Sequence, residues 1–229
     1  MKKVTIMPDT PKNPLEQMGL YAGVCWGADT SDKEKNIRRG KGCIDSGHGR
    51  ILELPQVYMV IEGYSARCIR EFYTHIGGNP TRLQESTRYI QYGDFDYIVS
   101  PSIAKDKKAN YIYKAVMKII SFAYKKLEKL GIPKEDIANI LPLGMETKII
   151  DRTNARQIID MSHQRDCARA YWEMRDLMHQ IEVELSNYSE EWAYIIKSQC
   201  MPKCELFGYC NEGKKSWGRY PLKESIDNK

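Results

Sequence analysis

Residues 154–165 have the sequence NARQIIDMSHQR, and they begin a helical region that extends to about Leu185 without proline or glycine. The second half of this region carries one apolar face at three- and four-residue spacing: Met174, Leu177, Met178, Ile181 and Leu185. Ser189, with two acidic residues behind it, predicts the start of a last helix that ends near Gln199. This part of the chain is therefore predicted to be almost entirely helical.

Residues 112–130 repeat apolar side chains at helical spacing, and Gly131 and Pro133 supply the expected stop and restart signals. Residues 56–62 and 96–99 are rich in β-branched and aromatic side chains and predict strands. The first fifty residues are polar and are expected to be irregular. We expect one α+β domain over residues 1–199, with a central β-sheet and long helices, and a cysteine-containing extension over residues 200–229.

The amino-acid composition limits the classes of protein to which this chain can belong. The 229 residues are 42% apolar and 28% charged, which excludes a disordered chain. The net charge of +5 suits phosphate-bearing small molecules and falls short of a nucleic-acid-binding surface. No apolar run approaches the ~20 residues of a membrane span, and no signal peptide is visible, so a soluble cytoplasmic protein is expected. Seven cysteines without a secretory signal argue against a disulfide framework.

Three polar segments could carry chemistry. The first is the turn Gly47-His48-Gly49 with Glu53 behind it, and the second is residues 74–89, which combine a Gly-Gly-Asn-Pro turn with arginines and hydroxyls. The third is the opening helix of residues 154–165. Each segment also has an interpretation without a function. The first could be a solvated histidine at a helix start, and the second a polar surface loop. The third could be an exposed helix face with i,i+4 ion pairs such as Arg156 with Asp160.

Taken together, the segments resemble the flavin-dependent thymidylate synthases. The resemblance runs from about Gly47 to Ile181. It rests on these elements in this order: Gly47-His48 with Glu53, Glu62-Gly63-Tyr64-Ser65, Ser86-Thr87-Arg88-Tyr89, Leu141-Pro142, Asn154-Ala155-Arg156, Arg165, and Trp172-Glu173. It implies that family's fold and its reaction, the reductive methylation of dUMP to dTMP.

The resemblance also implies roles for single residues. The nucleotide monophosphate would be held by Gln84, Ser86 and Arg88, often across a subunit boundary, and its pyrimidine ring by Arg165. Arg165 would be the catalytic residue, because it polarises the uracil, and no protein nucleophile is expected. The flavin FAD would be held by six residues: His48, Glu53, His75, Asn154, Arg156 and Asp160. NADPH is the implied reductant, methylenetetrahydrofolate the carbon donor, and a homotetramer the assembly.

This sequence departs from the family pattern at three cationic positions. Thr74-His75-Ile76 stands where the family has Arg-His-Arg, and two glycines follow it. Ala138 stands where an arginine that contacts the nucleotide is expected. Arg82, or backbone N–H groups of the Gly77-Gly78 turn, are candidates to replace part of this charge. These departures motivate a rival activity, hydroxymethylation or another modification of a pyrimidine deoxynucleotide.

The C-terminal tail raises two further alternatives. Cys200, Cys204 and Cys210 are weak candidates for a metal site, because zinc usually takes four ligands and the tail has no histidine. Reduced cysteines without metal are the preferred interpretation. The stretch Lys214-Lys215-Ser216-Trp217 gives slight support to a non-catalytic homologue that binds nucleotides or nucleic acid, although neither nucleic acid nor a membrane is an expected partner.

Overall fold

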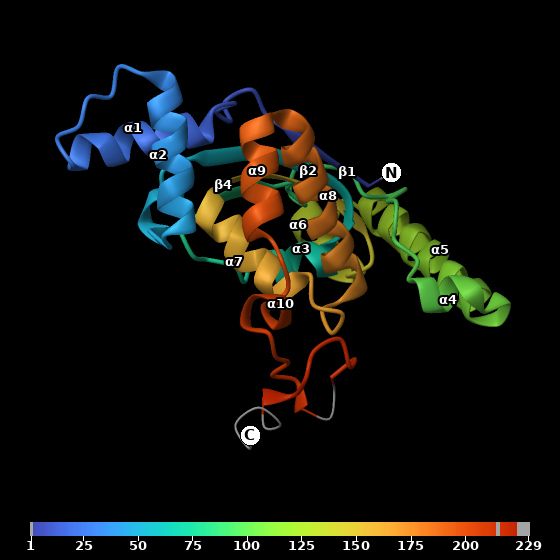
Figure 1. Cartoon of the computed structure of the whole chain (residues 1–229). Coiled ribbons are helices and arrows are strands. Elements are labelled where there is room, and N and C mark those ends of the chain that lie inside the picture. Colours follow the sequence, from blue (N-terminus) through green and yellow to red (C-terminus); the bar gives the residue numbers. More distant parts are fainter. Residues whose placement is uncertain (1, 214–215, 224–229) are drawn as a thin grey trace. The chain divides into compact units, whose positions relative to one another are not determined.

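The computed structural model describes residues 2–213 and 216–223 (Figure 1). Lys214 and Lys215, the two lysines of the basic tail stretch, lie outside the described residues. Within the part that is described, none of the helices combines the length and the apolar character needed to cross a membrane. The chain divides into two compact units. Of the described residues, unit 1 contains those of the ranges 2–3, 61–74 and 82–150, and unit 2 those of 4–60, 75–81, 151–213 and 216–223.

The strands form a four-stranded sheet in the order β1-β2-β4-β3. They are β1 (Lys3–Ile6), β2 (Gln56–Ser65), β3 (Thr81–Gln84) and β4 (Glu146–Asn154). In β2 the side chains of Val57, Met59 and Ile61 alternate into the core and are fully buried, which confirms the strand predicted at residues 56–62. The strand predicted at residues 96–99 is wrong, because Tyr97 forms only an isolated bridge to Met145 before a helix starts at Pro101.

Unit 1 is built around one long helix. Its helices are α3 (Ala66–Phe72), α4 (Pro101–Lys105), α5 (Lys107–Lys129), α6 (Lys134–Ile137) and the 3-10 turn η2 (Ala138–Ile140). The Asp106 carboxylate accepts hydrogen bonds from the first N–H groups of α5, and Gly131 follows the helix with φ +79°. The helix predicted over residues 112–130 is confirmed. Tyr124 of α5 packs in a buried cluster with Tyr92, Ile137 and Met145.

The apolar stripe of α5 is largely exposed in this chain. Ile112 is 62% exposed and Ile119 64%, whereas Met117 and Tyr124, on another face of the helix, are buried. A row of exposed apolar side chains along one face of a long helix is typical of an interaction surface.

Unit 2 begins with a helix pair where the sequence predicted irregular structure. α1 (Pro14–Cys25) and α2 (Lys33–Asp45) pack against each other (Figure 1). Gly19 and Gly40 permit this close approach, because a Cβ at either position would lie within 2.2 Å of the backbone of the other helix. Glycines lower helix propensity, and here they are retained for packing. The irregular prediction for residues 1–50 is therefore wrong.

The other helices described in unit 2 are η1 (Gly49–Glu53), α7 (Ala155–Arg165), α8 (Trp172–Tyr188), α9 (Glu190–Gln199) and α10 (Lys203–Phe207). Of these, α7, α8 and α9 lie in the regions predicted to be helical, whereas η1 and α10 were not predicted. The predicted helical region is interrupted at residues 166–171, a stretch that has no apolar stripe to bury and so gains little from helix packing. Ser189 accepts a hydrogen bond from the Trp192 N–H and starts α9, as predicted.

Candidate functional site

The turn η1 and the helix α7 bring together several of the residues assigned to the flavin. An Nη1 donor of Arg156 lies 2.8 Å from Oε1 of Glu53, and its Nε lies 4.0 Å from Asp160. The Ala155 N–H donates to the Pro55 carbonyl at 3.1 Å and holds the start of α7 against this turn. His48 is the exposed residue before η1. The cluster is solvent-accessible and combines one guanidinium with two carboxylates.

The loop of residues 75–81 packs on the first turn of α7. The Asn154 side chain is buried, and its Oδ1 accepts a hydrogen bond from the Gln157 N–H at 2.9 Å. A Cβ at Gly78, which has φ +69°, would lie 2.4 Å from the Asn154 amide, and a Cβ at Gly77 would lie 2.2 Å from Gln157. The two glycines therefore allow the loop to reach this position, a role that larger residues could not fill.

His75 and Arg165, from two distant segments, form a hydrogen-bonded pair. The Arg165 Nε–H donates to Nε2 of His75 at 2.8 Å, and His75 is buried. Because Nε2 accepts, the neutral imidazole carries its proton on Nδ1. The pair fixes the guanidinium of Arg165 at the end of α7.

The structure adds one cation that sequence reasoning missed. Arg152, on β4, donates from Nη2 to the Asn79 carbonyl at 3.0 Å and to the Thr81 hydroxyl at 3.1 Å. A cation two residues before Asn154 was the available sequence signal. Arg82, considered above as a replacement cation, instead lies over the Phe72 ring, with 4.5 Å to the centroid, and donates to the Tyr73 carbonyl.

Unit 1 contains the residues assigned to the nucleotide monophosphate. Nε2 of Gln84 donates to the Thr147 hydroxyl at 3.1 Å, and the Ser86 hydroxyl accepts from the Arg88 N–H at 3.2 Å. The exposed Arg88 guanidinium forms an ion pair with Glu135, with 2.9 Å from Nε to Oε2. An anionic ligand at Arg88 would compete with this carboxylate.

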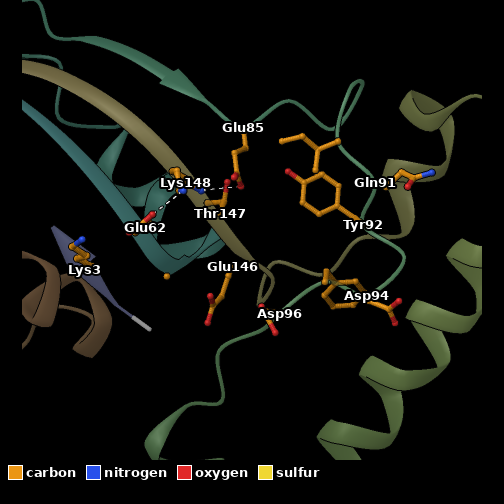
Figure 2. Close-up of a pocket in the computed structure, with 13 residues that line it drawn as sticks. Lys3, Glu62, Glu85, Gln91, Tyr92, Asp94, Asp96, Glu146, Thr147 and Lys148 are labelled. Carbon is orange, nitrogen blue, oxygen red and sulfur yellow. Dashed lines mark hydrogen bonds and ion pairs between the residues drawn. The ribbon is translucent and has the colours of Figure 1, made fainter. Parts of the chain in front are cut away.

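A pocket of about 500 Å³ opens beside this loop (Figure 2). Its charged lining residues are mostly acidic: Glu62, Glu85, Asp94, Asp96 and Glu146 against Lys3 and Lys148. Figure 2 shows Lys148 between Glu62 and Glu85; its ammonium lies 2.8 Å from the Glu62 carboxylate, which raises the pKa of Lys148 and lowers that of Glu62. Ser86 and Arg88 do not line the pocket, and its negative charge disfavours a phosphate there.

The three cysteines that are close in the sequence of the extension do not form one group in the structure. Cys204 and Cys210 line a cavity of unit 2 together with Cys167, from the loop after α7, whereas Cys200 is not among its lining residues. Burial and the nearby Glu182 raise the pKa of the Cys200 thiol. In the described part of the chain, no three His, Cys, Asp or Glu side chains are placed to hold a metal ion.

Two carboxyl groups lie close together at the C-terminal end of α7. Asp166, the residue after α7, hydrogen-bonds to Glu182 of α8, and Oε1 of Glu182 is buried with no partner among the described residues. Burial, together with the neighbouring Asp166, raises the pKa of Glu182 to about 8. Burial raises the pKa of Asp166 to about 6, although His179 opposes this shift. The pair is therefore expected to share a proton near neutral pH.

This pair predicts a pH-dependent stability. The folded protein keeps a proton that the unfolded chain releases above the ordinary Glu pKa of 4.5, so stabilisation is complete below that value and is lost as the pH rises through about 8. Glu182→Gln keeps a hydrogen-bond donor and needs no proton. Urea unfolding at pH 8.5 should show the variant more stable than the parent by on the order of 1–2 kcal/mol, with no advantage at pH 5. Glu184→Gln, on the same helix, is the control, and equal pH slopes for parent and Glu182→Gln would contradict the shared proton.

All six residues assigned to FAD lie in unit 2, together with Arg165, and Gln84, Ser86 and Arg88 lie in unit 1. The donor set of unit 2 fits a dinucleotide cofactor chemically. Arg156 can pair with a phosphate, and Glu53 and Asp160 can accept hydrogen bonds from ribose hydroxyls or an amino group.

The comparisons with known proteins agree on one family. The signature of the family described as thymidylate synthase complementing protein matches residues 7–188. A Pyrococcus furiosus protein named flavin-dependent thymidylate synthase is 31% identical, over 93% of this chain and 90% of its own length. A Nitratidesulfovibrio vulgaris protein of the same name is 29% identical, over 85% of this chain and 81% of its own.

Solved structures support the fold. The Helicobacter pylori flavin-dependent thymidylate synthase, in complex with FAD and dUMP, aligns with a TM-score of 0.69 over 87% of this chain and 99% of its own. The two sequences are 16% identical. The expected α+β fold of this type is confirmed.

Proposed function

The chain belongs to the family of thymidylate synthase complementing proteins, the flavin-dependent thymidylate synthases, and from this membership we propose that it methylates dUMP reductively to dTMP. The observation that carries the proposal is the family match over residues 7–188, which includes the cluster around Arg156 and the pair of His75 with Arg165. The hydride chemistry would be supplied by FAD reduced by NADPH, and the carbon by methylenetetrahydrofolate.

Arg88 and Ser86 would bind the phosphate of dUMP. A guanidinium, a hydroxyl and nearby backbone N–H groups are the donors that a phosphate dianion needs. The Arg88 side chain is exposed, and its Glu135 partner is a surface carboxylate, so exchanging Glu135 for a phosphate costs little. Gln84, already oriented by Thr147, would donate or accept at the same ligand.

Arg165 would act on the pyrimidine. A guanidinium stays protonated at all physiological pH values, so it can stabilise negative charge that develops on a uracil oxygen as the hydride arrives. His75 is a positioning residue in this scheme, because Nε2 of its imidazole holds the Arg165 Nε–H. The middle residue of the altered Arg-His-Arg segment would thus keep a role even though both flanking arginines are absent.

The flavin would rest on α7 and η1. Arg156 would contact a phosphate of FAD, with Glu53 keeping the guanidinium in place, and Asp160 would act as an acceptor only. Arg152, anchored at Asn79 and Thr81, offers a cation beside the altered segment and could offset part of the charge lost at Thr74 and Ile76.

Product analysis tests the reaction. The purified protein is incubated with dUMP, FAD, NADPH and methylenetetrahydrofolate, and the nucleotide product is identified by mass spectrometry. We expect dTMP. A hydroxymethylated nucleotide would favour the rival activity that the lost cations motivate, and unchanged dUMP under all these conditions would contradict both.

We also propose that the protein acts as a homotetramer with its active sites between subunits. The exposed stripe of α5, which includes Ile112, Val116 and Ile119, is an apolar surface that a second copy could cover. Gln84, Ser86 and Arg88 of one subunit would then meet Arg165 of another.

Ile119→Glu tests this assembly. A carboxylate at the centre of the stripe would have to be buried in the interface, so light scattering should show mainly dimers or monomers where the parent is a tetramer. Lys114→Glu, on a different face of α5, is the matched control and should leave the mass unchanged. A tetramer of undiminished stability in Ile119→Glu would exclude this face.

A further inference from the structure

A cavity of about 380 Å³ in unit 2 adjoins Arg165. One wall is the end of α7 and the loop after it, with His163, Arg165, Cys167 and Arg169. The other wall is the C-terminal extension, with Lys203 and Cys204 of α10 and with Cys210 and Glu212 beyond it. We name this cavity the extension pocket. The extension thus completes a cavity beside the arginine that is proposed to act on the pyrimidine.

The extension pocket is positively charged. Among the described residues that line it, Arg165, Arg169 and Lys203 are cationic and Glu212 is the one carboxylate. Nε of Arg169 lies 3.9 Å from Glu212, which is beyond hydrogen-bond distance, and both side chains are more than 40% exposed, so this pair neutralises the guanidinium only weakly. Two cationic side chains thus remain in excess around one cavity, an arrangement that attracts anions.

Two further features suit a ligand site. Arg165 is held by its hydrogen bond to His75, so one of the three cations is fixed in place before a ligand arrives. The Gln164 and Asn211 side chains, which also line the cavity, add neutral hydrogen-bonding groups. The volume is at the low end for small-molecule sites, which suits one part of a large ligand better than the whole of it.

We propose that the extension pocket binds the anionic end of a cosubstrate. The chemistry it recognises is a carboxylate or phosphate group: either the glutamate tail of the folate or a phosphate of the nicotinamide dinucleotide. The identity of these cosubstrates rests on the proposed function, but the charge of the pocket does not. The dUMP phosphate is not its ligand, because Ser86 and Arg88 are assigned to that group.

Direct binding tests the pocket without turnover. The full-length protein is titrated calorimetrically at low salt with triglutamate and, separately, with inorganic pyrophosphate. Lys203→Met and Arg169→Gln should each weaken binding of the preferred probe about five- to tenfold, as expected for the loss of one partly exposed cation from an anion site. Lys197→Met removes an exposed lysine of α9 outside the pocket and should bind like the parent.

Kinetics then identify the source of the anion. If the folate tail is the ligand, Lys203→Met should raise KM for triglutamyl methylenetetrahydrofolate and leave KM for the monoglutamyl form nearly unchanged. If the dinucleotide is the ligand, the variant should raise KM for NADPH. KM for dUMP should not change in either case.

The two proposals can fail separately. Charge-dependent binding of a probe without dTMP formation would support the pocket and remove the proposed function. A protein that makes dTMP, but binds neither probe or binds it equally in Lys203→Met and Lys197→Met, would overturn the inference about the extension pocket.

Discussion

Arg165→Ala is expected to lower kcat for dTMP formation by about 10²–10³-fold, the range for removing one preorganised donor to charge that develops in a transition state. The variant should still retain FAD, because the residues proposed to hold the flavin phosphates, Arg156 foremost, are unchanged. The measurement is single-turnover dTMP formation with the flavin reduced beforehand, so that the reductant step does not mask the loss.

One further variant separates the charge of Arg165 from its geometry, and another serves as a control. Arg165→Lys keeps a positive charge but loses the planar guanidinium and the Nε–H that donates to His75, so most of the loss should persist. Arg38→Ala removes an exposed arginine of α2 with no assigned role and should turn over like the parent. Single-turnover rates for Arg165→Ala within a factor of two of the parent would contradict the catalytic role.

Arg88→Ala should weaken dUMP binding by ~1.5–3 kcal/mol, the range for a hydrogen bond to a charged group. This corresponds to roughly 10- to 150-fold in Kd. The bound flavin should be retained, and the flavin absorbance change on adding dUMP gives the affinity. Arg70→Ala, at an exposed arginine of α3 in the same unit, is the matched control. Unchanged affinity in Arg88→Ala would remove the phosphate assignment.

A substitution of Glu135, the ion-pair partner of Arg88, provides a second test of the phosphate assignment. Because Glu135 occupies the guanidinium in the absence of a ligand, Glu135→Gln should tighten dUMP binding about two- to fivefold, the worth of an exposed ion pair. Weaker binding in Glu135→Gln would mean that the carboxylate orients Arg88 instead of competing for it.

The sequence predicted the helices and strands that are determined by periodicity or by a capping residue. The strand at residues 56–62, the helix at residues 112–130 and the helix start at Ser189 each follow from periodicity or a cap, and the structure confirms them. The strand β4 and the helix pair α1–α2 were missed. In α1 and α2 the glycines, which locally disfavour helix, serve a contact between helices that no local pattern reveals.

In the candidate site, too, the sequence predicted local contacts but not contacts between distant segments. The approach of Arg156 to Asp160 follows from i,i+4 spacing on one helix. The Glu53–Arg156 and His75–Arg165 contacts join residues 103 and 90 positions apart, and only the resemblance to a family linked those segments beforehand. Arg152 was missed because its place two residues before Asn154 does not reveal its contacts with Asn79 and Thr81, which are more than 70 positions away in the sequence.

We predict that unit 2 binds a flavin although neither residue flanking His75 is an arginine. The most direct test is the visible absorption spectrum of the purified protein, recorded before and after adding FAD and then dUMP, with desalting between the steps. We predict a flavin band that survives desalting and shifts when dUMP is added. A colourless protein that separates from added FAD on desalting would contradict the proposed flavin site.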